Sequence, residues 1–153
     1  GLGDVYKRQT PLVVDATGDV GLYCSLSSYN ISYYDSTTGD LRFARSEDDG
    51  ATWTAQTIDS DGIVGRYTSL EKSGSNLYLS YYDATNKDLK LAKSTDSGAT
   101  WSIQTLDQQG DVGQYTSITV FLGAFGREYV YVSYFDETND RLKFAASTNS
   151  GGS

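Results

Sequence analysis

The sequence has no histidine, no methionine, one proline and one cysteine among its 153 residues. Without histidine, the chain lacks the usual general base of enzymes and the imidazole ligand of many zinc sites. The single Cys24 cannot form an internal disulfide, so it does not reveal the redox compartment. No apolar run reaches the roughly 18 residues that a membrane-spanning helix needs. We therefore expect no cofactor, no metal site and no membrane partner.

The charge is strongly acidic, with 12 basic and 20 acidic side chains and a formal net charge of −8. Nucleic acids and anionic membrane surfaces attract proteins through basic patches. The acidic balance therefore excludes nucleic acid as an expected partner.

Three copies of one unit fill most of the chain. The tetrapeptide Ser-Tyr-(Tyr/Phe)-Asp occurs at residues 32–35, 80–83 and 133–136. A second motif, SEDDGATW at residues 46–53, returns as STDSGATW at 94–101 and begins again at Ser147. Between residues 31–53 and 79–101, 14 of 23 positions are identical, which indicates duplication.

Residues 1–9, GLGDVYKRQ, resemble a translated sequencing adaptor. The repeats support this interpretation, because the position that holds Trp53 and Trp101 in the complete copies holds Gln9 here. We therefore exclude residues 1–9 from the fold. The remaining chain has 10 basic and 19 acidic side chains, a net charge of −9.

Each complete unit has the pattern of four short strands. In the second unit we predict strands over residues 67–72, 77–83, 89–93 and 101–106, separated by turn-forming residues. The strand at 77–83 carries apolar side chains on both faces, so its sheet is packed on both sides. A four-stranded unit of this length, stacked between copies of itself, is typical of a propeller blade. We predict an all-β fold, a partial β-propeller of about three four-stranded antiparallel blades, open and part of a larger propeller.

The repeated motif also suggests a family. Both complete copies match Ser-x-Asp-x-Gly-x-Thr-Trp and resemble the Asp-box, or BNR repeat, of bacterial sialidase-type β-propellers. The resemblance implies a structural turn, in which Ser and Asp bond backbone amides, Gly takes a tight conformation and Trp packs between strands. It also implies an extracellular or cell-surface location. The residues at the motif positions are Ser46, Asp48, Gly50, Thr52, Trp53, Ser94, Asp96, Gly98, Thr100 and Trp101, with Ser147, Asn149 and Gly151 in the incomplete third copy.

The repeats predict the domain organisation. Residues 10–153 form the propeller part, divided into residues 10–58 (strand D of a preceding blade plus the first blade), 59–106 (second blade) and 107–153 (third blade, truncated). The first unit is four residues short near residues 25–29, which predicts a distorted blade or an error in the sequence. The third unit has an apolar insertion at 120–127, which either packs against another domain or blade or forms a longer strand pair. Three blades cannot close a ring, so two blade faces should be exposed and should favour self-association.

The connections between units contain the candidate binding residues. Asp15, Asp59 and Asp107 recur there and are interpreted as turn residues. One position differs among the copies, as Leu22, Arg66 and Gln114, and a residue that serves one asymmetric site should differ in this way. The predicted ligand contacts are Asp61, Arg66, Tyr67, Gln114 and Tyr115, although Arg66 could also be an ordinary solvated arginine. The repeated tyrosines Tyr33, Tyr34, Tyr81, Tyr82 and Tyr134 are interpreted as packing residues, or alternatively as a carbohydrate platform.

Two functions remain after these exclusions. The first is a non-catalytic module that recognises a glycan or a protein ligand. The alternative is part of a sialidase-like exo-glycoside hydrolase, for which the resemblance implies a tyrosine nucleophile, two carboxylates and three arginines. No set of residues here can be assigned to those roles. Arg42 returns as Lys90 and Lys143, which suggests a surface cation of each blade. Nearly identical blades also argue against catalysis, because an active site needs a unique constellation.

Overall fold

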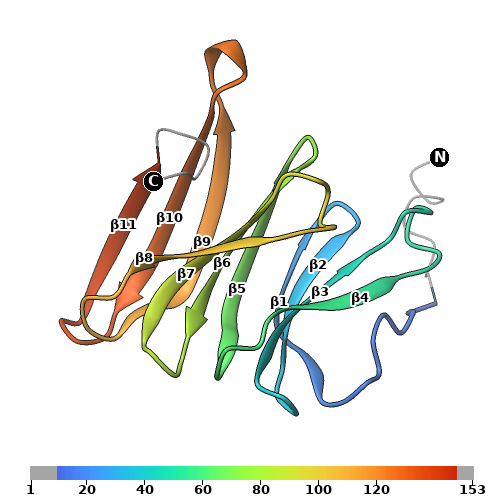
Figure 1. Ribbon diagram of the computed structural model, residues 1–153, viewed down its shortest axis with the longest axis horizontal. Helices are drawn as coiled ribbons and strands as arrows, with labels where there is room; N and C mark the ends of the chain where they lie inside the picture. The colour runs from blue at the N-terminus through green and yellow to red at the C-terminus, as the bar shows by residue number, and fades with distance from the viewer. Residues whose placement is uncertain (1–9, 148–153) are drawn as a thin grey trace.

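The computed structural model describes residues 10–147 and is all-β in that range (Figure 1). The strands are β1 (Val20–Ser27), β2 (Asn30–Asp35), β3 (Asp40–Arg45), β4 (Thr54–Asp59), β5 (Val64–Ser73), β6 (Asn76–Asp83), β7 (Asp88–Ser94), β8 (Ser102–Asp107), β9 (Val112–Leu122), β10 (Glu128–Asp136) and β11 (Arg141–Ser147). The 3₁₀ turn η1 (Ala124–Gly126) joins β9 to β10. Within residues 10–147, no helix has the length and apolar character needed to cross a membrane.

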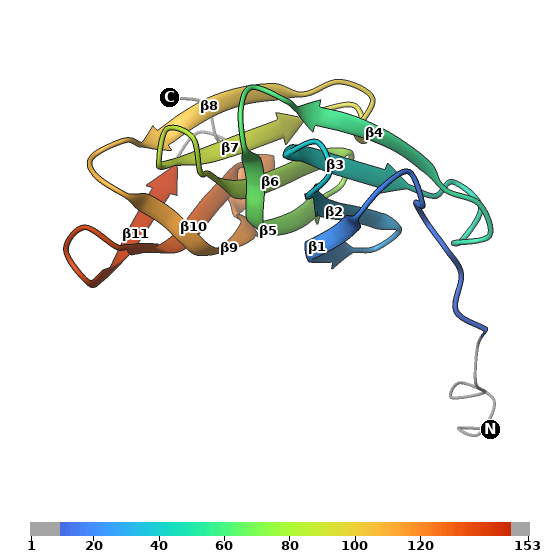
Figure 2. The ribbon, with the colours of Figure 1, turned by 90° about the horizontal axis from the view of Figure 1, so that it is seen from below.

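The strands form three antiparallel sheets in chain order. The first two sheets have the orders β1-β2-β3-β4 and β5-β6-β7-β8, and the third contains β9, β10 and β11. The sheets stack face to face as successive blades, with the inner strands β1, β5 and β9 next to one another (Figure 2). The predicted fold is confirmed, and the three blades form an open part of a propeller. The strands expected in the second unit correspond to β5–β8.

Two parts of the structure differ from a set of complete blades. Residues 10–19, where the sequence predicts strand D of a preceding blade, contain no strand, because no neighbouring strand pairs with them among the described residues. Within residues 10–147 the third blade has three strands, and Asn149 and Gly151 of the third motif lie outside this range. The division into domains therefore stays a prediction.

The first unit is regular despite its shorter length. A tight turn at Ser28 and Tyr29 joins β1 to β2, and Ser28 adopts a left-handed conformation with φ of 55°. The missing residues therefore shorten the hairpin and leave a four-stranded blade. In the third blade the insertion lengthens the β9–β10 strand pair. The ring centroids of Phe121 and Tyr129, which lie opposite each other in this pair, are 6.2 Å apart. Phe125 at its tip is fully exposed.

Apolar seams hold the blades together. At the first seam, Leu41 and Phe43 of β3 pack against Val64, Leu77 and Tyr81 of the second blade, and all five side chains are buried. The second seam repeats this arrangement one blade later.

Hydroxyl groups supplement the apolar contacts at each seam. Ser32 donates a hydrogen bond to Thr68 at 2.9 Å, and Thr116 donates to Ser80 at 2.8 Å at the equivalent place. These bonds satisfy polar groups that the stacked sheets bury, so they let each blade face approach its neighbour without an unpaired hydroxyl.

The two turns at residues 46–53 and 94–101 have the same internal hydrogen bonds. In the second, the Ser94 hydroxyl accepts from the Gly98 amide at 2.8 Å, and Asp96 accepts from the amide and hydroxyl of Thr100 at 2.8 and 2.6 Å. The Trp101 indole donates to the Gly98 carbonyl at 3.1 Å. The repeated Ser, Asp, Thr and Trp side chains of each turn thus have local partners, which fixes the link between the third and fourth strands.

Acid should weaken these two turns. Hydrogen bonds from Thr52 and Thr100 lower the pKa of Asp48 and Asp96 from 3.8 to about 2. Because the folded-state pKa lies below the ordinary value, the stabilisation is complete above about pH 5 and is lost as the pH falls through 4 towards 2. We expect the melting temperature of the unmodified chain to fall more steeply between pH 5 and 2 than that of the Asp48→Asn/Asp96→Asn double variant. Parallel melting curves would contradict this assignment.

Candidate functional site

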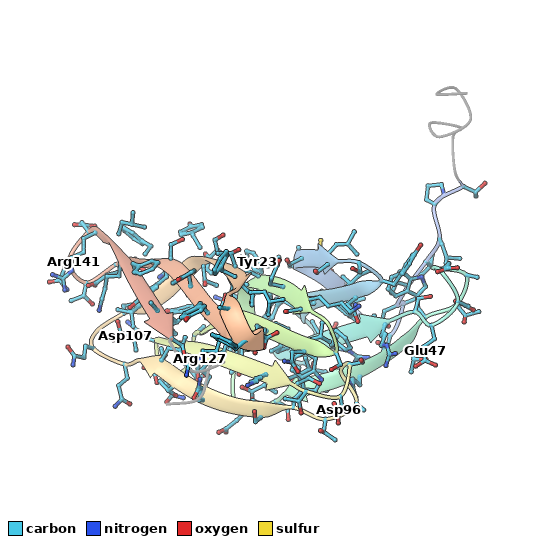
Figure 3. All side chains as sticks on the ribbon, turned by 90° about the horizontal axis from the view of Figure 1, so that it is seen from above. Tyr23, Glu47, Asp96, Asp107, Arg127 and Arg141 are labelled. Carbon is cyan, nitrogen blue, oxygen red and sulfur yellow. The ribbon has the colours of Figure 1, made fainter. Side chains whose placement is uncertain are left out.

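The candidate binding residues lie at one end of the blades. The connections β4–β5 and β8–β9 are at this end together with the β2–β3, β6–β7 and β10–β11 turns, low in Figure 1. The turns at 46–53 and 94–101 lie at the opposite end. Figure 3 shows Tyr23 beside the inner strands and Asp96 towards the outer strands. The two repeated motifs are therefore well separated, and the connections between blades can form a common surface.

Each inner strand begins with the same irregular backbone. The register shifts after Val20 in β1 and after Val64 in β5, so both strands contain a bulge. Gly65 at the bulge has φ of 95°, and Tyr67 two residues later has φ of 55°. A positive φ is uncommon for a bulky residue and requires support from its surroundings. The bulge turns the tyrosine out of the normal alternation of the strand.

This backbone places three tyrosines in one row. The ring centroids of Tyr23 and Tyr67 are 4.6 Å apart, and those of Tyr67 and Tyr115 are 4.4 Å apart. Tyr23 and Tyr115 are exposed at the two ends of the row. Burial raises the pKa of Tyr67 to about 12, and the neighbouring hydroxyls of Tyr115 and Tyr23 add to this rise. We call Tyr23, Tyr67 and Tyr115 the tyrosine row.

Arg66 flanks the row and has no acidic partner among the described residues. Its guanidinium carbon lies 5.5 Å from the centre of the Tyr34 ring, in the preceding blade. Within residues 10–147, no carboxylate lies within ion-pairing distance of this guanidinium. Arg66 therefore presents hydrogen-bond donors beside aromatic rings without being neutralised.

In the third blade, Gln114 occupies the position that Arg66 has in the second, and its side chain contacts two carboxylates. Its side-chain amide donates to Glu137 and lies 3.4 Å from Asp111. Asp111 also accepts from the Tyr82 hydroxyl at 2.7 Å and pairs with Lys87 at 3.3 Å. Burial raises the pKa of Asp111, but the bonds from Tyr82, Lys87 and Gln114 outweigh this and lower it.

Asp61 stays apart from the other four predicted contacts. It is exposed in the β4–β5 connection, and its backbone amide donates to Asp59 at 3.0 Å. Among the described residues, no hydrogen bond or ion pair joins its carboxylate to Arg66. The structure thus brings Tyr67 and Tyr115 into contact, with Arg66 and Gln114 as their chain neighbours in β5 and β9, and does not join Asp61 to them.

The recurring aspartates are more than turn residues. Asp59 accepts a hydrogen bond from the buried Tyr81 hydroxyl at 2.6 Å, and Lys90 bridges Asp59 and Asp83 at 3.4 and 3.1 Å. The same arrangement joins Asp15, Tyr33, Arg42 and Asp35 in the first blade, and Asp107, Tyr134 and Lys143 in the third.

The interpretation of Arg42, Lys90 and Lys143 as surface cations was wrong. Their side chains are only 12–24% exposed, because each lies over the carboxylates at the end of its blade. The aspartate, the tyrosine and the cation occur together in all three blades. Because a feature that every blade shares is expected to serve the fold, we assign these contacts to the packing of the blades.

Sequence reasoning missed Tyr23 as a site residue. Tyr23 recurs as Tyr67 and Tyr115, and a residue that recurs in every copy suggests packing. The signal that could have identified it was the Gly-x-Tyr spacing after a strand start, since a glycine there permits a bulge. Glu137 and Asp111 were also missed, because only the fold brings their turns together.

Comparison with solved structures finds a similar arrangement of strands in part of a sialidase. A point mutant of NanB sialidase from Streptococcus pneumoniae matches with a TM-score of 0.50 and 20% identity, over 78% of this chain and 21% of the sialidase. Xylan beta-1,4-xylosidase from Bacillus halodurans matches with a TM-score of 0.38 and 16% identity, over 88% of this chain and 32% of that one. No protein-family model and no curated protein sequence matches the chain. The similarity to the sialidase concerns the fold, and the chain spans about a fifth of that enzyme's length.

Proposed function

We propose that the tyrosine row is a glycan-binding surface and that the chain is a non-catalytic recognition module. The observation that supports this most directly is the row itself. Three partly exposed aromatic side chains are held on strained backbone, 4.4–4.6 Å apart, at the end of the propeller where the connections between blades meet. Sugars bind to aromatic rings through the apolar faces of their pyranose rings, and the tyrosine hydroxyls can bond the sugar hydroxyls.

The side chains beside the row give the surface its asymmetry. Leu22, Arg66 and Gln114 occupy the same place in the three blades, so the row has an apolar, a cationic and an amide neighbour in turn. An extended glycan lying along the row would therefore meet a different group at each residue. Arg66 is the group suited to an acidic sugar, because its charge has no carboxylate partner within residues 10–147.

The hydrolase alternative has less support. It requires Arg66 to gather with a tyrosine and two carboxylates, and the guanidinium instead lies over the Tyr34 ring. The tyrosine–aspartate pairs of the structure, such as Tyr81 with Asp59, are buried between blades and recur in each. A hydroxyl there is inaccessible to a sugar, so these pairs do not provide a nucleophile.

We also propose that the turns at 46–53 and 94–101 are Asp-boxes and that the protein is extracellular or on the cell surface. The hydrogen bonds of Ser94, Asp96 and Trp101 agree with the structural role that the resemblance implies. Location rests on the resemblance alone. The motif contributes to the fold, and the function is assigned to the tyrosine row.

Calorimetric titration with two soluble probes, 3′-sialyllactose and xylohexaose, tests the glycan proposal. At least one probe should bind with a Kd below about 1 mM, equivalent to roughly −4 kcal/mol. Tyr67→Ala removes the centre of the row and should weaken that binding at least tenfold. Phe125→Ala removes an exposed aromatic ring far from the row and should leave it unchanged. Equal affinities for the two variants would refute the assignment.

Arg66→Leu separates the role of charge from the role of the aromatic row. It reproduces the residue that the first blade already has at this position, Leu22, so the backbone tolerates it. We expect about tenfold weaker binding of 3′-sialyllactose, whose carboxylate would pair with Arg66, and unchanged binding of xylohexaose. Release of free sialic acid from 3′-sialyllactose by the unmodified chain would instead favour the hydrolase alternative.

A further inference from the structure

The tyrosine row belongs to a larger cluster of phenol side chains at the inner strands. The ring centroids of Tyr23 and Tyr67 are 4.6 Å apart, and those of Tyr67 and Tyr115 are 4.4 Å apart. The Tyr34 centroid lies 6.1 Å from that of Tyr23, and the Tyr82 centroid lies 6.1 Å from that of Tyr67. Tyrosines of all three blades therefore form one connected series of ring contacts.

The tyrosines that are buried between blades have a different arrangement. The hydroxyls of Tyr33, Tyr81 and Tyr134 each donate to an aspartate, at 2.6, 2.6 and 2.8 Å. In the row, by contrast, the hydroxyl of Tyr67 interacts with the hydroxyls of its two tyrosine neighbours. The row is therefore a place where one phenol can react with another.

Tyr67 and Tyr115 meet at their hydroxyl ends across the contact between β5 and β9, which lie side by side (Figure 1). Their ring planes are inclined by 44°. When a phenol loses an electron and a proton, the unpaired electron spreads from the oxygen to the two ring carbons next to the C–O bond. Two such radicals couple through these ortho carbons. The short distance between the rings and the proximity of their hydroxyls bring the ortho carbons of the two side chains close together.

The backbone holds both rings in this contact. Each tyrosine follows the bulge glycine of its strand by two residues, and the φ angles of Tyr67 and Tyr115 are 55° and 52°. A Cβ on either bulge glycine, Gly65 or Gly113, would lie 2.7 Å from a backbone atom of the preceding blade. Packing between blades thus fixes both bulges. Groups held in this way react far faster than the same groups meeting by diffusion.

We propose that Tyr67 and Tyr115 are a site of oxidative cross-linking, at which a one-electron oxidant of the peroxidase type joins them as dityrosine. Each phenol gives up one electron and one proton. The two radicals then form a carbon–carbon bond between ortho carbons, and the hydrogen on each of these carbons moves to the ring oxygen, which restores the aromatic rings. The two electrons and two protons reduce one molecule of hydrogen peroxide to two molecules of water.

The product is a covalent staple between the second and third blades. It closes the chain from Tyr67 to Tyr115 into a loop, and such a link restricts the unfolded chain more than the folded one. The two rings already touch, so the link forms without movement of the blades. The inference rests on this contact and holds whether or not the row binds a glycan.

Peptide mapping of the full chain, treated with a haem peroxidase and hydrogen peroxide, tests the inference. Trypsin releases Tyr67 in residues 67–72 and Tyr115 in residues 94–127, and each of these peptides contains a single tyrosine. We expect these two peptides to be joined, with the loss of two hydrogen atoms. The fraction of joined chains should not depend on protein concentration, because both rings belong to one chain. Absence of the joined peptides, or a yield that rises in proportion to concentration, would overturn the proposal.

Matched phenylalanine variants test the role of the row. Tyr67→Phe keeps the ring but removes the phenol, and it should lower dityrosine fluorescence about tenfold, since coupling then depends on chance encounters. Tyr29→Phe is the control, because Tyr29 is an exposed tyrosine of the β1–β2 turn, outside the cluster, and its loss should leave the yield unchanged. Equal yields from the two variants would mean that exposed tyrosines couple at random, against the proposed site.

Urea denaturation followed by circular dichroism tests the staple. The treated chain should unfold at a higher urea concentration than the untreated chain. Tyr67→Phe treated in the same way controls for oxidation elsewhere, and its midpoint should not rise. If the midpoint of the cross-linked chain stayed at that of the untreated chain, the link would not hold the two blades together and the staple would be refuted.

Discussion

Replacing Phe43 by alanine should lower the free energy of unfolding by about 3–5 kcal/mol, the usual range for a buried phenylalanine in a core. Its ring is buried at the first seam, with the Trp101 ring 5.0 Å away in an edge-to-face arrangement. Phe43 also lies against Gly98, where a Cβ would come within 2.6 Å of the phenylalanine ring. The truncation therefore removes a contact between blades and leaves a cavity beneath Trp101.

Urea denaturation followed by tryptophan fluorescence measures this effect. The midpoint should fall while the slope with denaturant stays the same, which identifies a change in stability. Phe125→Ala is the control, because Phe125 is fully exposed and its truncation should change the free energy by less than about 0.5 kcal/mol. A similar midpoint for the two variants would show that the first seam contributes little to the fold.

The blade architecture could be predicted from the sequence because the same strand pattern and motifs occur in successive units. The strands expected at 77–83 and 89–93 correspond to β6 and β7 within one residue at each end. Alternation of apolar residues specifies which faces are buried, and the spacing of the copies specifies the size of a blade. In contrast, residues 10–15 carry the pattern of a strand but form none, because a strand needs a neighbour to bond with.

The candidate site was predicted less completely. The rule that variable positions mark a site pointed to Arg66 and Gln114, and Tyr23 was not among the predicted contacts. The row arises from a bulge, and a one-residue irregularity redirects a side chain in a way that strand periodicity does not describe. The partners of Gln114 are Asp111 in the β8–β9 connection and Glu137 in the β10–β11 turn. Only the folded chain brings these two segments together, so the sequence alone does not predict the contacts.

The close approach of successive blades accounts for the second large effect that we expect. Gly65 lies at the bulge of β5 with φ of 95°, and a Cβ there would be 2.7 Å from the Cα and 2.8 Å from the Cβ of Leu41. Those atoms belong to the backbone and base of a fully buried residue, so they cannot rotate away. Gly65→Ala combines backbone strain with this overlap, and each costs about 1–3 kcal/mol. We expect a loss of about 3–5 kcal/mol in the free energy of unfolding.

Gly74→Ala separates the two contributions to that loss. Gly74 also has a positive φ, 59°, in the turn between β5 and β6, but no atom lies within 4 Å of its Cβ position. The control should therefore lose only the roughly 1–2 kcal/mol of the left-handed conformation. Urea denaturation of both variants gives the difference, which reports the contact between the Gly65 bulge and Leu41. If the two variants lost the same free energy of unfolding, backbone strain alone would account for the loss at Gly65. The contact between the Gly65 bulge and Leu41 would then contribute nothing to it.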